Sequence, residues 1–316
     1  MEREFVALGT VVIVSASNVS QPVFEAAVAD LERHLLSLGA AWYPRSPGEL
    51  RDLNTAIAGG GTAVVSSALI SLLEKATEYE RRSGGRFNAC IGRLSELWGF
   101  YDLPDGPVQA PDQGDLDTLV ATRPACRQLR IDRETREVSS PNPYVAVDVG
   151  GIAKGALLDD ARRILLAHGI RDAIVNLGGD LLVTGLVAGR NARIGIRAPV
   201  GTTAMAGLDV HPGEAVVTSG NYERFVEIDG EHYPHILDPA TGSPVRHTAS
   251  VSVVHGDPTL ADAAATALLV GGPDAFDELV AAFGLDYALL VDAKGDTRLT
   301  PAMADRLNWI EAGRDR

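Results

Sequence analysis

Apolar residues recur at helical spacing in several stretches of the chain. Residues 22–40, PVFEAAVADLERHLLSLGA, carry apolar side chains on one helical face and reach a glycine near their end, which predicts an amphipathic helix. Residues 258–270 are apolar on almost every face, which is typical of a buried helix. The same spacing predicts further helices over 63–85, 91–99, 153–169, 273–283 and close to the C-terminus.

Short apolar or alternating stretches predict strands between these helices. The first strand lies near the N-terminus, because residues 11–14 are β-branched and favour extended backbone. A hairpin is predicted over 127–138, and a strand over 144–150 leads into the helix at 153–169. The remaining strands are predicted over 173–185, 192–199, 215–220, 222–230, 232–239, 249–255 and 286–293. Because strands and helices occur in blocks, we predict an α+β fold with mostly antiparallel sheets flanked by helices.

The length of 316 residues is sufficient for one large or two medium domains. Residues 101–124 contain DLPDGP and APDQGD, and this richness in Pro, Gly and Asp predicts a long surface excursion. That excursion is the best candidate for a boundary within the chain. The sequence holds no internal repeat and no low-complexity segment.

The charge balance excludes several classes of partner. A net charge of −14 and an isoelectric point near 4.9 leave no basic surface of the kind that nucleic acid or an anionic membrane requires. Apolar runs also stay shorter than the roughly 18 residues that span a bilayer. We therefore expect neither nucleic-acid binding nor stable membrane insertion.

Two features bear on the cellular compartment. The apolar N-terminal segment is preceded by residues of net negative charge, Glu2, Arg3 and Glu4, whereas a signal peptide begins with a positively charged region. Cys90 and Cys126 match no metal-binding spacing, form at most one bridge and lie in no catalytic pattern, which is compatible with a reducing compartment. The resulting expectation is a cytoplasmic protein.

The stretch ADAAATALLV, residues 261–270, places one acid and one hydroxyl in an otherwise apolar helix. Asp262 and Thr266 are four residues apart and lie on one helical face, where they form a pair of oxygens. Two interpretations remain open. Asp262 is a capping residue at the helix start together with Asp257 and Thr259, or it has a cation, an arginine or backbone N–H groups as its partner.

Two further segments carry side chains that are suited to ligand binding or catalysis. DVGGIAKG, residues 148–155, predicts a strand end, a glycine turn and a helix start with Lys154 in the first turn, an arrangement that suits a phosphate. The alternative is a tight turn with a solvated lysine. HILDPATGSPV, residues 235–245, places His235 shortly before an Asp-Pro turn, where it suits activation of a hydroxyl. The alternative for His235 is a structural role.

Four motifs follow one another along the second half of the chain. VDVGGIAKGALLDD contains Asp-x-x-x-x-x-Lys-Gly, NLGGDLLVTG contains Asn-x-Gly-Gly-Asp, TSGNYERFVEIDGEHYPHILDPATGSPV is a long central signature, and ADAAATAL contains Ala-Asp-Ala-x-x-Thr-Ala. Weaker similarities precede them in LGT, ELRDLN and GGRFNACIGRLSELWGF. In this order and spacing the motifs resemble those of the FAD:protein FMN transferases, the ApbE family.

The resemblance implies a single catalytic domain over 1–316, with the active site in a cleft between two lobes and a possible lobe boundary within 101–124. It implies His235 as the catalytic base. The implied magnesium ligands are Asp262, Thr266 and the backbone oxygen of Gly151. The implied FAD-binding residues are Leu8, Arg86, Phe87, Asn88, Asp148, Lys154 and Ile236.

The implied reaction cleaves FAD at its diphosphate, releases AMP and joins FMN through a phosphoester to a Thr or Ser hydroxyl of an acceptor protein. Two alternatives remain: an FAD pyrophosphatase that yields FMN and AMP, and a flavin-binding protein without turnover. Where the family has Phe-Asp-x-Thr, this chain has FNAC at residues 87–90, and Leu8 replaces the usual Met. The departures affect the flavin end of the predicted site and leave the metal end intact.

Overall fold

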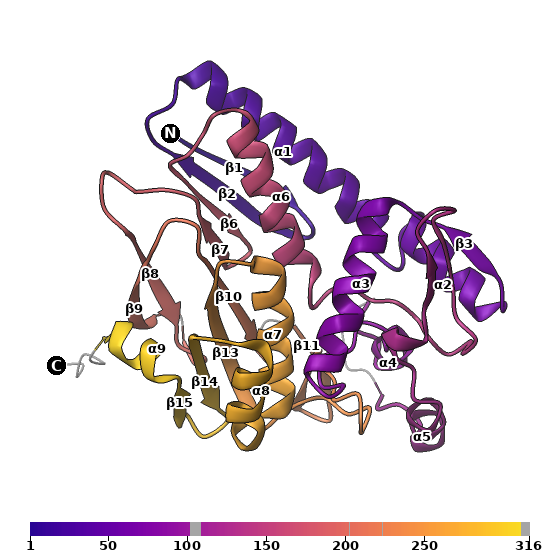
Figure 1. The fold of residues 1–316 in the computed structure, drawn as a ribbon. Coiled ribbons are helices and arrows are strands. Elements are labelled where there is room, and N and C mark those ends of the chain that lie inside the picture. The colour runs from indigo at the N-terminus through magenta and orange to yellow at the C-terminus, as the bar shows by residue number, and fades with distance from the viewer. Residues whose placement is uncertain (102–108, 202, 223, 311–316) are drawn as a thin grey trace.

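A large antiparallel sheet forms the centre of the molecule (Figure 1). The computed structural model describes residues 1–101, 109–201, 203–222 and 224–310. The eight strands of this sheet occur in the order β1-β2-β6-β7-β10-β13-β14-β15. Their bounds are Glu2–Ala7, Thr10–Ala16, Ala173–Leu177, Asp180–Val183, Ala215–Gly220, Thr248–His255, Tyr287–Asp292 and Thr297–Leu299. Every pairing is antiparallel, so the predicted α+β class is confirmed.

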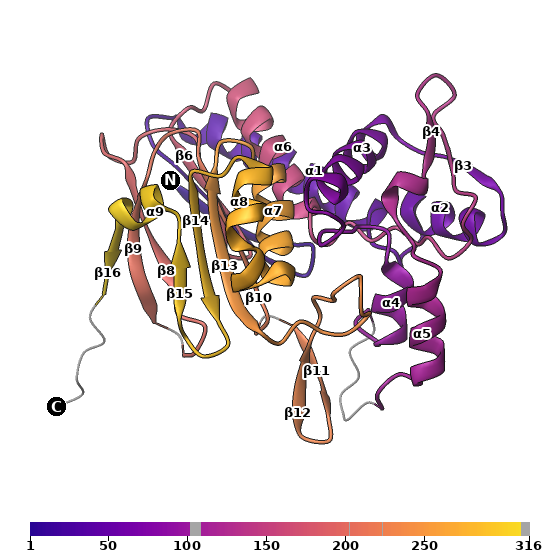
Figure 2. The same ribbon diagram turned by 60° about the horizontal axis from the view of Figure 1, so that its bottom comes forward.

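Helices cover one face of this sheet (Figures 1 and 2). They are α1 (Gln21–Ala41), α6 (Ala153–Ala167), α7 (Pro258–Gly271) and α8 (Phe276–Phe283), the last entered through η2 (Pro273–Ala275). α7 packs on β10 and β13 and also contacts α6 and α8. Because α7 is enclosed on these sides, its sequence is apolar almost all round.

A smaller sheet covers the opposite face. It contains β8 (Ala192–Arg197), β9 (Ala204–Val210) and β16 (Leu307–Trp309), and α9 (Pro301–Arg306) precedes its last strand. Leu208 and Val210 on this sheet share an apolar cluster with Val183 and Val254 on the central sheet. The central sheet is therefore buried on both faces where β7 and β13 lie.

The helical lobe comprises residues 49–101 and 109–139 and lies beside the central sheet (Figure 1). Its elements are α2 (Glu49–Ala58), β3 (Thr62–Val64), α3 (Ser67–Arg82), α4 (Gly92–Leu97), α5 (Gln113–Ala121), η1 (Cys126–Gln128), β4 (Arg130–Asp132) and β5 (Glu137–Ser139). A separate hairpin, β11 (Phe225–Ile228) and β12 (Glu231–Pro234), packs on α4 and α5 through Val226 and Leu116.

Several predicted elements differ from the structure. The N-terminal strand is a hairpin of β1 and β2, because the chain reverses at Leu8 and Gly9, whose φ angles of 57° and 70° are left-handed. The predicted strand over 144–150 is wrong, since only Ala146 makes a single bridge, to Ile91. The predicted excursion contains α5, and residues 102–108 lie outside the described residues. The single-domain and lobe-boundary assignments stay predictions.

Other elements were not foreseen from periodicity. The predicted helix over 63–85 is shorter, because β3 occupies its start and Ser66 caps α3 by accepting a hydrogen bond from Leu69 N–H at 3.1 Å. The predicted strand over 173–185 turns back at Gly178 and Gly179 and becomes β6 and β7. The sequence analysis did not identify α2, β9, β15 or β16.

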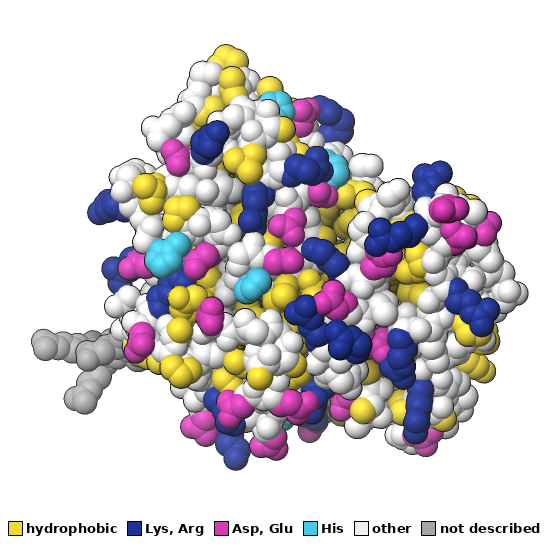
Figure 3. Space-filling model, in the orientation of Figure 1, with side chains coloured by type: hydrophobic (Ala, Val, Ile, Leu, Met, Phe, Trp, Pro, Cys, Tyr) yellow, Lys and Arg dark blue, Asp and Glu magenta, His cyan; other side chains and the backbone are white. Residues whose placement is uncertain are grey.

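The two cysteines form a disulfide bond in the structure, with their Cα atoms 5.2 Å apart. Disulfides persist in oxidising compartments and are rare in the cytosol, so this pairing does not support the cytoplasmic expectation. No helix within the described part of the chain is long and apolar enough to cross a membrane. On the face seen in Figure 3, acidic and basic side chains lie among one another.

Candidate active site

A cleft of about 1340 Å³ lies between the helical lobe and the central sheet. Its walls come from the β1–β2 turn, the segment after α3, the start of α6, the chain after β12 and the inner side of α7. All site residues predicted from the sequence line this cleft, namely Leu8, Arg86, Phe87, Asn88, Asp148, Gly151, Lys154, His235, Ile236, Asp262 and Thr266. The fold therefore brings them together, and their individual roles stay predictions.

Asp262 lies inside α7 and not at its cap. The N-cap of α7 is Asp257, whose side chain accepts a hydrogen bond from Leu260 N–H at 3.1 Å. Asp262 is 3% exposed, and its Oδ2 accepts a hydrogen bond from Gly155 N–H at 2.9 Å, in the first turn of α6. Its carboxylate thus faces the N-terminus of a neighbouring helix, where a negative charge is favoured.

Lys154 and Asp180 form an ion pair next to Asp262, in which the Asp180 carboxyl is buried and the Lys154 side chain is 35% exposed. Asp180 is 1% exposed, and its Oδ1 also accepts a hydrogen bond from Thr218 N–H at 2.9 Å. Burial raises the pKa of Asp262 to about 7, which the Lys154 ammonium opposes and the Asp180 carboxylate reinforces. Two acids and one lysine therefore lie together at the cleft, and burial favours the neutral form of both acids while the Lys154 ammonium favours their charged form.

We expect Lys154→Met to lower the free energy of unfolding by about 2–3 kcal/mol, because it leaves the buried Asp180 carboxylate without its cation. The change is smaller than for a fully buried pair, since solvent screens the part-exposed Lys154 ammonium. Urea unfolding at neutral pH measures this change. The double variant Lys154→Met/Asp180→Asn is the matched control, since removing both charges should restore most of the stability. If the double variant is no more stable than the single one, the ion pair is not the source of the loss.

Oxygen atoms converge beside Asp262. Thr266 Oγ1 lies 3.3 Å from Ser219 Oγ. Gly151 approaches the same hydroxyl so closely that a Cβ at residue 151 would lie 3.3 Å from Thr266 Oγ1. The described residues contain no group of three or more His, Cys, Asp or Glu side chains suited to a metal. Asp262 and Thr266 instead offer a carboxylate and a hydroxyl, which are hard oxygen donors of the kind that Mg²⁺ accepts.

Asp148 shapes the glycine turn at the start of α6. Its Oδ1 accepts a hydrogen bond from Gly150 N–H at 2.9 Å, and its Oδ2 accepts one from Tyr101 Oη at 2.7 Å. Burial, with the charge of Asp148 beside it, raises the pKa of Tyr101, so the phenol stays a proton donor. Both oxygens of Asp148 thus help to place Gly150 and Gly151.

His235 follows β12 and is half-buried in the cleft wall. Its Nδ1 lies 3.1 Å from the carbonyl oxygen of Arg224. Because a carbonyl oxygen only accepts, Nδ1 carries the proton and Nε2 keeps its lone pair. Desolvation lowers the pKa of His235 to about 4, only partly opposed by the bond to Arg224. The ring is therefore neutral at pH 7 and able to accept a proton.

The residues at the predicted flavin end make mostly intramolecular contacts. Arg86 pairs with Glu278 on α8 at 3.0 Å. Phe87 is buried, and the Asn88 side chain hydrogen-bonds to the backbone of Pro124 and Cys90. These contacts show that this part of the cleft is fixed by the protein itself.

The sequence analysis missed three residues of the cleft region. Asp180 belongs to the quoted Asn-x-Gly-Gly-Asp motif, so the motif itself was the available signal. Tyr101 stands at the start of the predicted surface excursion, and no local pattern indicates its contact with Asp148. Ser219 reaches Thr266 only because β10 packs on α7.

Residues 8–289 match the sequence model of the ApbE family. The chain belongs to the ApbE family. It is 37% identical over 314 residues to the FAD:protein FMN transferase of Rhodobacter capsulatus, covering 99% of this chain and 59% of that protein. It is also 37% identical over 288 residues to the FAD:protein FMN transferase of Treponema pallidum (strain Nichols), covering 85% of this chain and 77% of that protein. The chain thus spans about three fifths of the length of the first relative.

Solved structures of the family share the fold. The ApbE protein of Thermotoga maritima superposes with a TM-score of 0.88 at 29% identity, covering 97% of this chain and 98% of that one. The apo form of the flavinyl transferase ApbE of Pseudomonas stutzeri superposes with a TM-score of 0.82 at 26% identity, covering 97% of this chain and 96% of that one. The ApbE-like fold predicted from the motifs is confirmed.

Proposed function

We propose that this ApbE-family protein transfers FMN from FAD to a Thr or Ser hydroxyl of an acceptor protein, with Mg²⁺ as cofactor and AMP as the second product. The observation that supports this most is that the oxygen cluster of Asp262 and Thr266, the Lys154 ammonium and the His235 ring line one cleft. The names of the relatives from Rhodobacter capsulatus and Treponema pallidum agree with this activity.

The start of α6 suits the diphosphate of FAD. Lys154 adds a positive charge to the first turn of α6, and the glycines before it let the backbone approach a ligand closely. The metal would be held by Asp262, Thr266 and the Gly151 carbonyl, and when bound it would neutralise charge on the diphosphate. The hard oxygens present fit that ion.

The reaction balances without a further reactant. The acceptor hydroxyl oxygen forms a bond to the phosphorus of the FMN half, and the bond from that phosphorus to the bridging oxygen breaks, so that AMP leaves. His235 Nε2 accepts the hydroxyl proton, while the Nδ1 contact with the Arg224 carbonyl keeps the ring in the required tautomer. Positioning and electrostatics supply most of the rate in such transfers.

We expect incubation with FAD, Mg²⁺ and a Thr-containing acceptor domain to raise the acceptor mass by that of FMN minus one water and to release one AMP for each adduct. Intact mass spectrometry and chromatography of the nucleotides measure the two products. An acceptor with Thr→Val at the modified position is the control, because it keeps the shape and lacks the nucleophile.

The same experiment separates the alternatives. AMP and FMN without an acceptor adduct would identify an FAD pyrophosphatase, in which water replaces the acceptor hydroxyl. Bound FAD without either product would identify a flavin-binding protein.

A further inference from the structure

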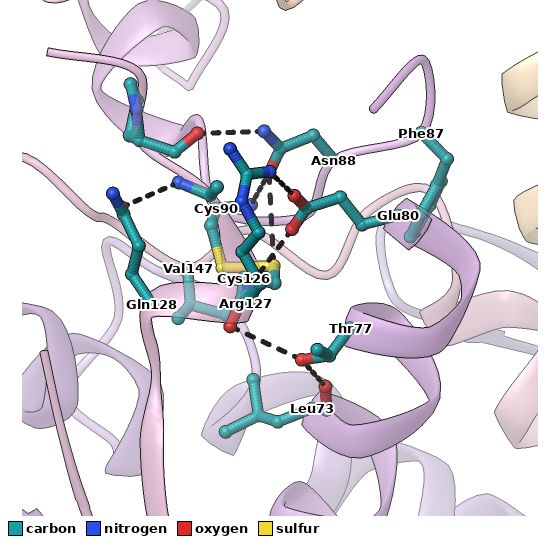
Figure 4. The surroundings of a disulfide bond; sticks show 12 residues. Leu73, Thr77, Glu80, Phe87, Asn88, Cys90, Cys126, Arg127, Gln128 and Val147 are labelled. Atoms are coloured by element: carbon teal, nitrogen blue, oxygen red, sulfur yellow. Dashed lines mark hydrogen bonds and ion pairs between the residues drawn. A yellow bond between two sulfur atoms is a disulfide. The ribbon is translucent and has the colours of Figure 1, made fainter. Parts of the chain in front are cut away.

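The disulfide joins two segments of the helical lobe beside the cleft (Figure 4). Cys90 belongs to the cleft-wall segment, residues 87–92, and Cys126 lies in η1, a separation of 36 residues in sequence. Both cysteines are fully buried. Because exchange with an external thiol depends on access to the sulfur atoms, this bridge is suited to a permanent cross-link more than to a rapid redox switch.

Asn88 connects the same two segments a second time. Its Nδ2 donates a hydrogen bond to the Pro124 carbonyl at 2.9 Å, and its Oδ1 accepts one from Cys90 N–H at 2.9 Å. The Cys126 sulfur lies 3.9 Å from the same Oδ1. An aspartate at residue 88 would lack the amide donor for Pro124. Asn88 and Cys90 therefore together connect the cleft-wall segment to the segment that contains Pro124 and Cys126.

The far end of this connection is anchored to α3. The Glu80 side chain is 2% exposed, and its Oε2 accepts a hydrogen bond from Arg127 N–H at 3.1 Å, while its Oε1 pairs with the Arg127 guanidinium. Thr77 Oγ1 donates to the Cys126 carbonyl at 3.4 Å (Figure 4). These contacts hold η1 in position against α3. The disulfide in turn holds Cys90 in position relative to η1.

At Cys90, the connection holds the cleft-wall segment, which contacts residues on the other side of the cleft. The Ala89 carbonyl accepts a hydrogen bond from Asp148 N–H at 2.8 Å, and the Cys90 carbonyl accepts one from Ala146 N–H at 3.3 Å. The Phe87 ring lies 3.4 Å from where a Cβ on Gly151 would be. Any shift of the cleft-wall segment therefore moves both Asp148 and the Gly151 backbone, which face the cleft from the other side.

We infer that Cys90 and Cys126, together with Asn88, are positioning residues that hold the FAD cleft in its binding-competent shape. The inference rests on the proposed function, since it assigns the ligand of the cleft as FAD. Without the bridge the wall samples other positions, and the apparent affinity falls with the fraction of molecules in the competent shape. A competent fraction of about one tenth raises the Kd tenfold.

The test compares FAD binding by the oxidised protein, by the protein purified throughout in dithiothreitol, and by the variant Cys90→Ala/Cys126→Ala. Dithiothreitol converts the bridge to two thiols and becomes its own cyclic disulfide, and alkylation after denaturation counts the thiols. The chain has two cysteines, so no other bond is affected. We expect a Kd for FAD, measured by calorimetry with Mg²⁺ well below the melting temperature, that is about tenfold higher in both bridge-free forms.

The variant Ser66→Ala provides the control for stability alone. It removes the cap of α3 and leaves the disulfide intact, and Ser66 is not part of the cleft. It should lower the melting temperature and keep the oxidised Kd. The double variant should also bind FAD equally with and without dithiothreitol.

An unchanged Kd in both bridge-free forms, with only a lower melting temperature, would show that the bridge merely stabilises the fold and would overturn the inference. Absence of FAD binding in the oxidised protein would instead overturn the proposed function, and the inference with it. The two failures are distinguishable because only the second affects the protein with its bridge intact.

Discussion

Asp262→Asn should abolish the magnesium-dependent increase in melting temperature that FAD gives to the native protein. In the wild type we expect FAD to stabilise strongly when Mg²⁺ is present and weakly after chelation. A ligand that binds only the native state at a hundredfold excess over its Kd adds about 2.7 kcal/mol, which corresponds to a rise of several degrees. Thermal unfolding with FAD, Mg²⁺ and chelator in all combinations measures the coupling.

The reason is electrostatic. Asp262 and Asp180 are both buried, and Lys154 supplies one positive charge beside them. A diphosphate brought into this site meets like charge unless a divalent cation is also present. An asparagine at residue 262 keeps the shape and keeps an oxygen for Gly155 N–H, but it loses the charge that would hold the cation.

Asp257→Asn is the matched control on the same helix. Asp257 caps α7 outside the cleft, and asparagine caps as well as aspartate. That variant should keep the full coupling between FAD and Mg²⁺. Equal stabilisation of Asp262→Asn by FAD with and without chelator, at the wild-type level, would leave Asp262 with a helix-packing role only and would remove the proposed metal site.

The sequence indicates which residues line this cleft, while their individual roles stay predictions. The cleft residues were identified because their motifs resemble those of the ApbE family. By itself, the acid and hydroxyl pair in the otherwise apolar α7 left a cap and a cation ligand both open. The helices α1 and α6 follow from spacing alone, because each presents one apolar face to the core. In these cases a local pattern contains the information.

Elements that depend on distant contacts were not predictable in this way. Residues 144–150 alternate like a strand, yet they pair at one bridge only, because hydrogen bonds from the cleft-wall segment and from Asn54 occupy their backbone groups. The β1–β2 turn uses Leu8 with a left-handed φ, which no turn rule suggests for leucine. The pairing of Cys90 with Cys126 depends on how η1 packs against α3, and spacing does not encode it.

His235→Ala should lower the rate of FMN transfer by roughly 10²–10⁴, because a general base contributes about that factor. The Kd for FAD should stay within a few fold of the wild type, since the ring serves the acceptor hydroxyl and not the diphosphate. Single-turnover transfer with saturating FAD and Mg²⁺ measures the chemical step, and calorimetry measures binding. His232→Ala is the matched control, because His232 lies in the hairpin just before His235 and outside the cleft, and its ring stacks on Phe225 with the ring centroids 4.0 Å apart.

The pH dependence adds a second readout for His235. Burial lowers its pKa from 6.5 to about 4, so the neutral ring that accepts a proton is present above that value and is lost as the pH falls through it. The kcat/KM of the wild type should therefore include an acid limb near pH 4 that reports protonation of the free enzyme. His235→Ala should lack this limb and His232→Ala should keep it. Transfer by His235→Ala at the wild-type rate, with the same acid limb, would remove His235 from the mechanism and would require another group in the cleft to accept the hydroxyl proton.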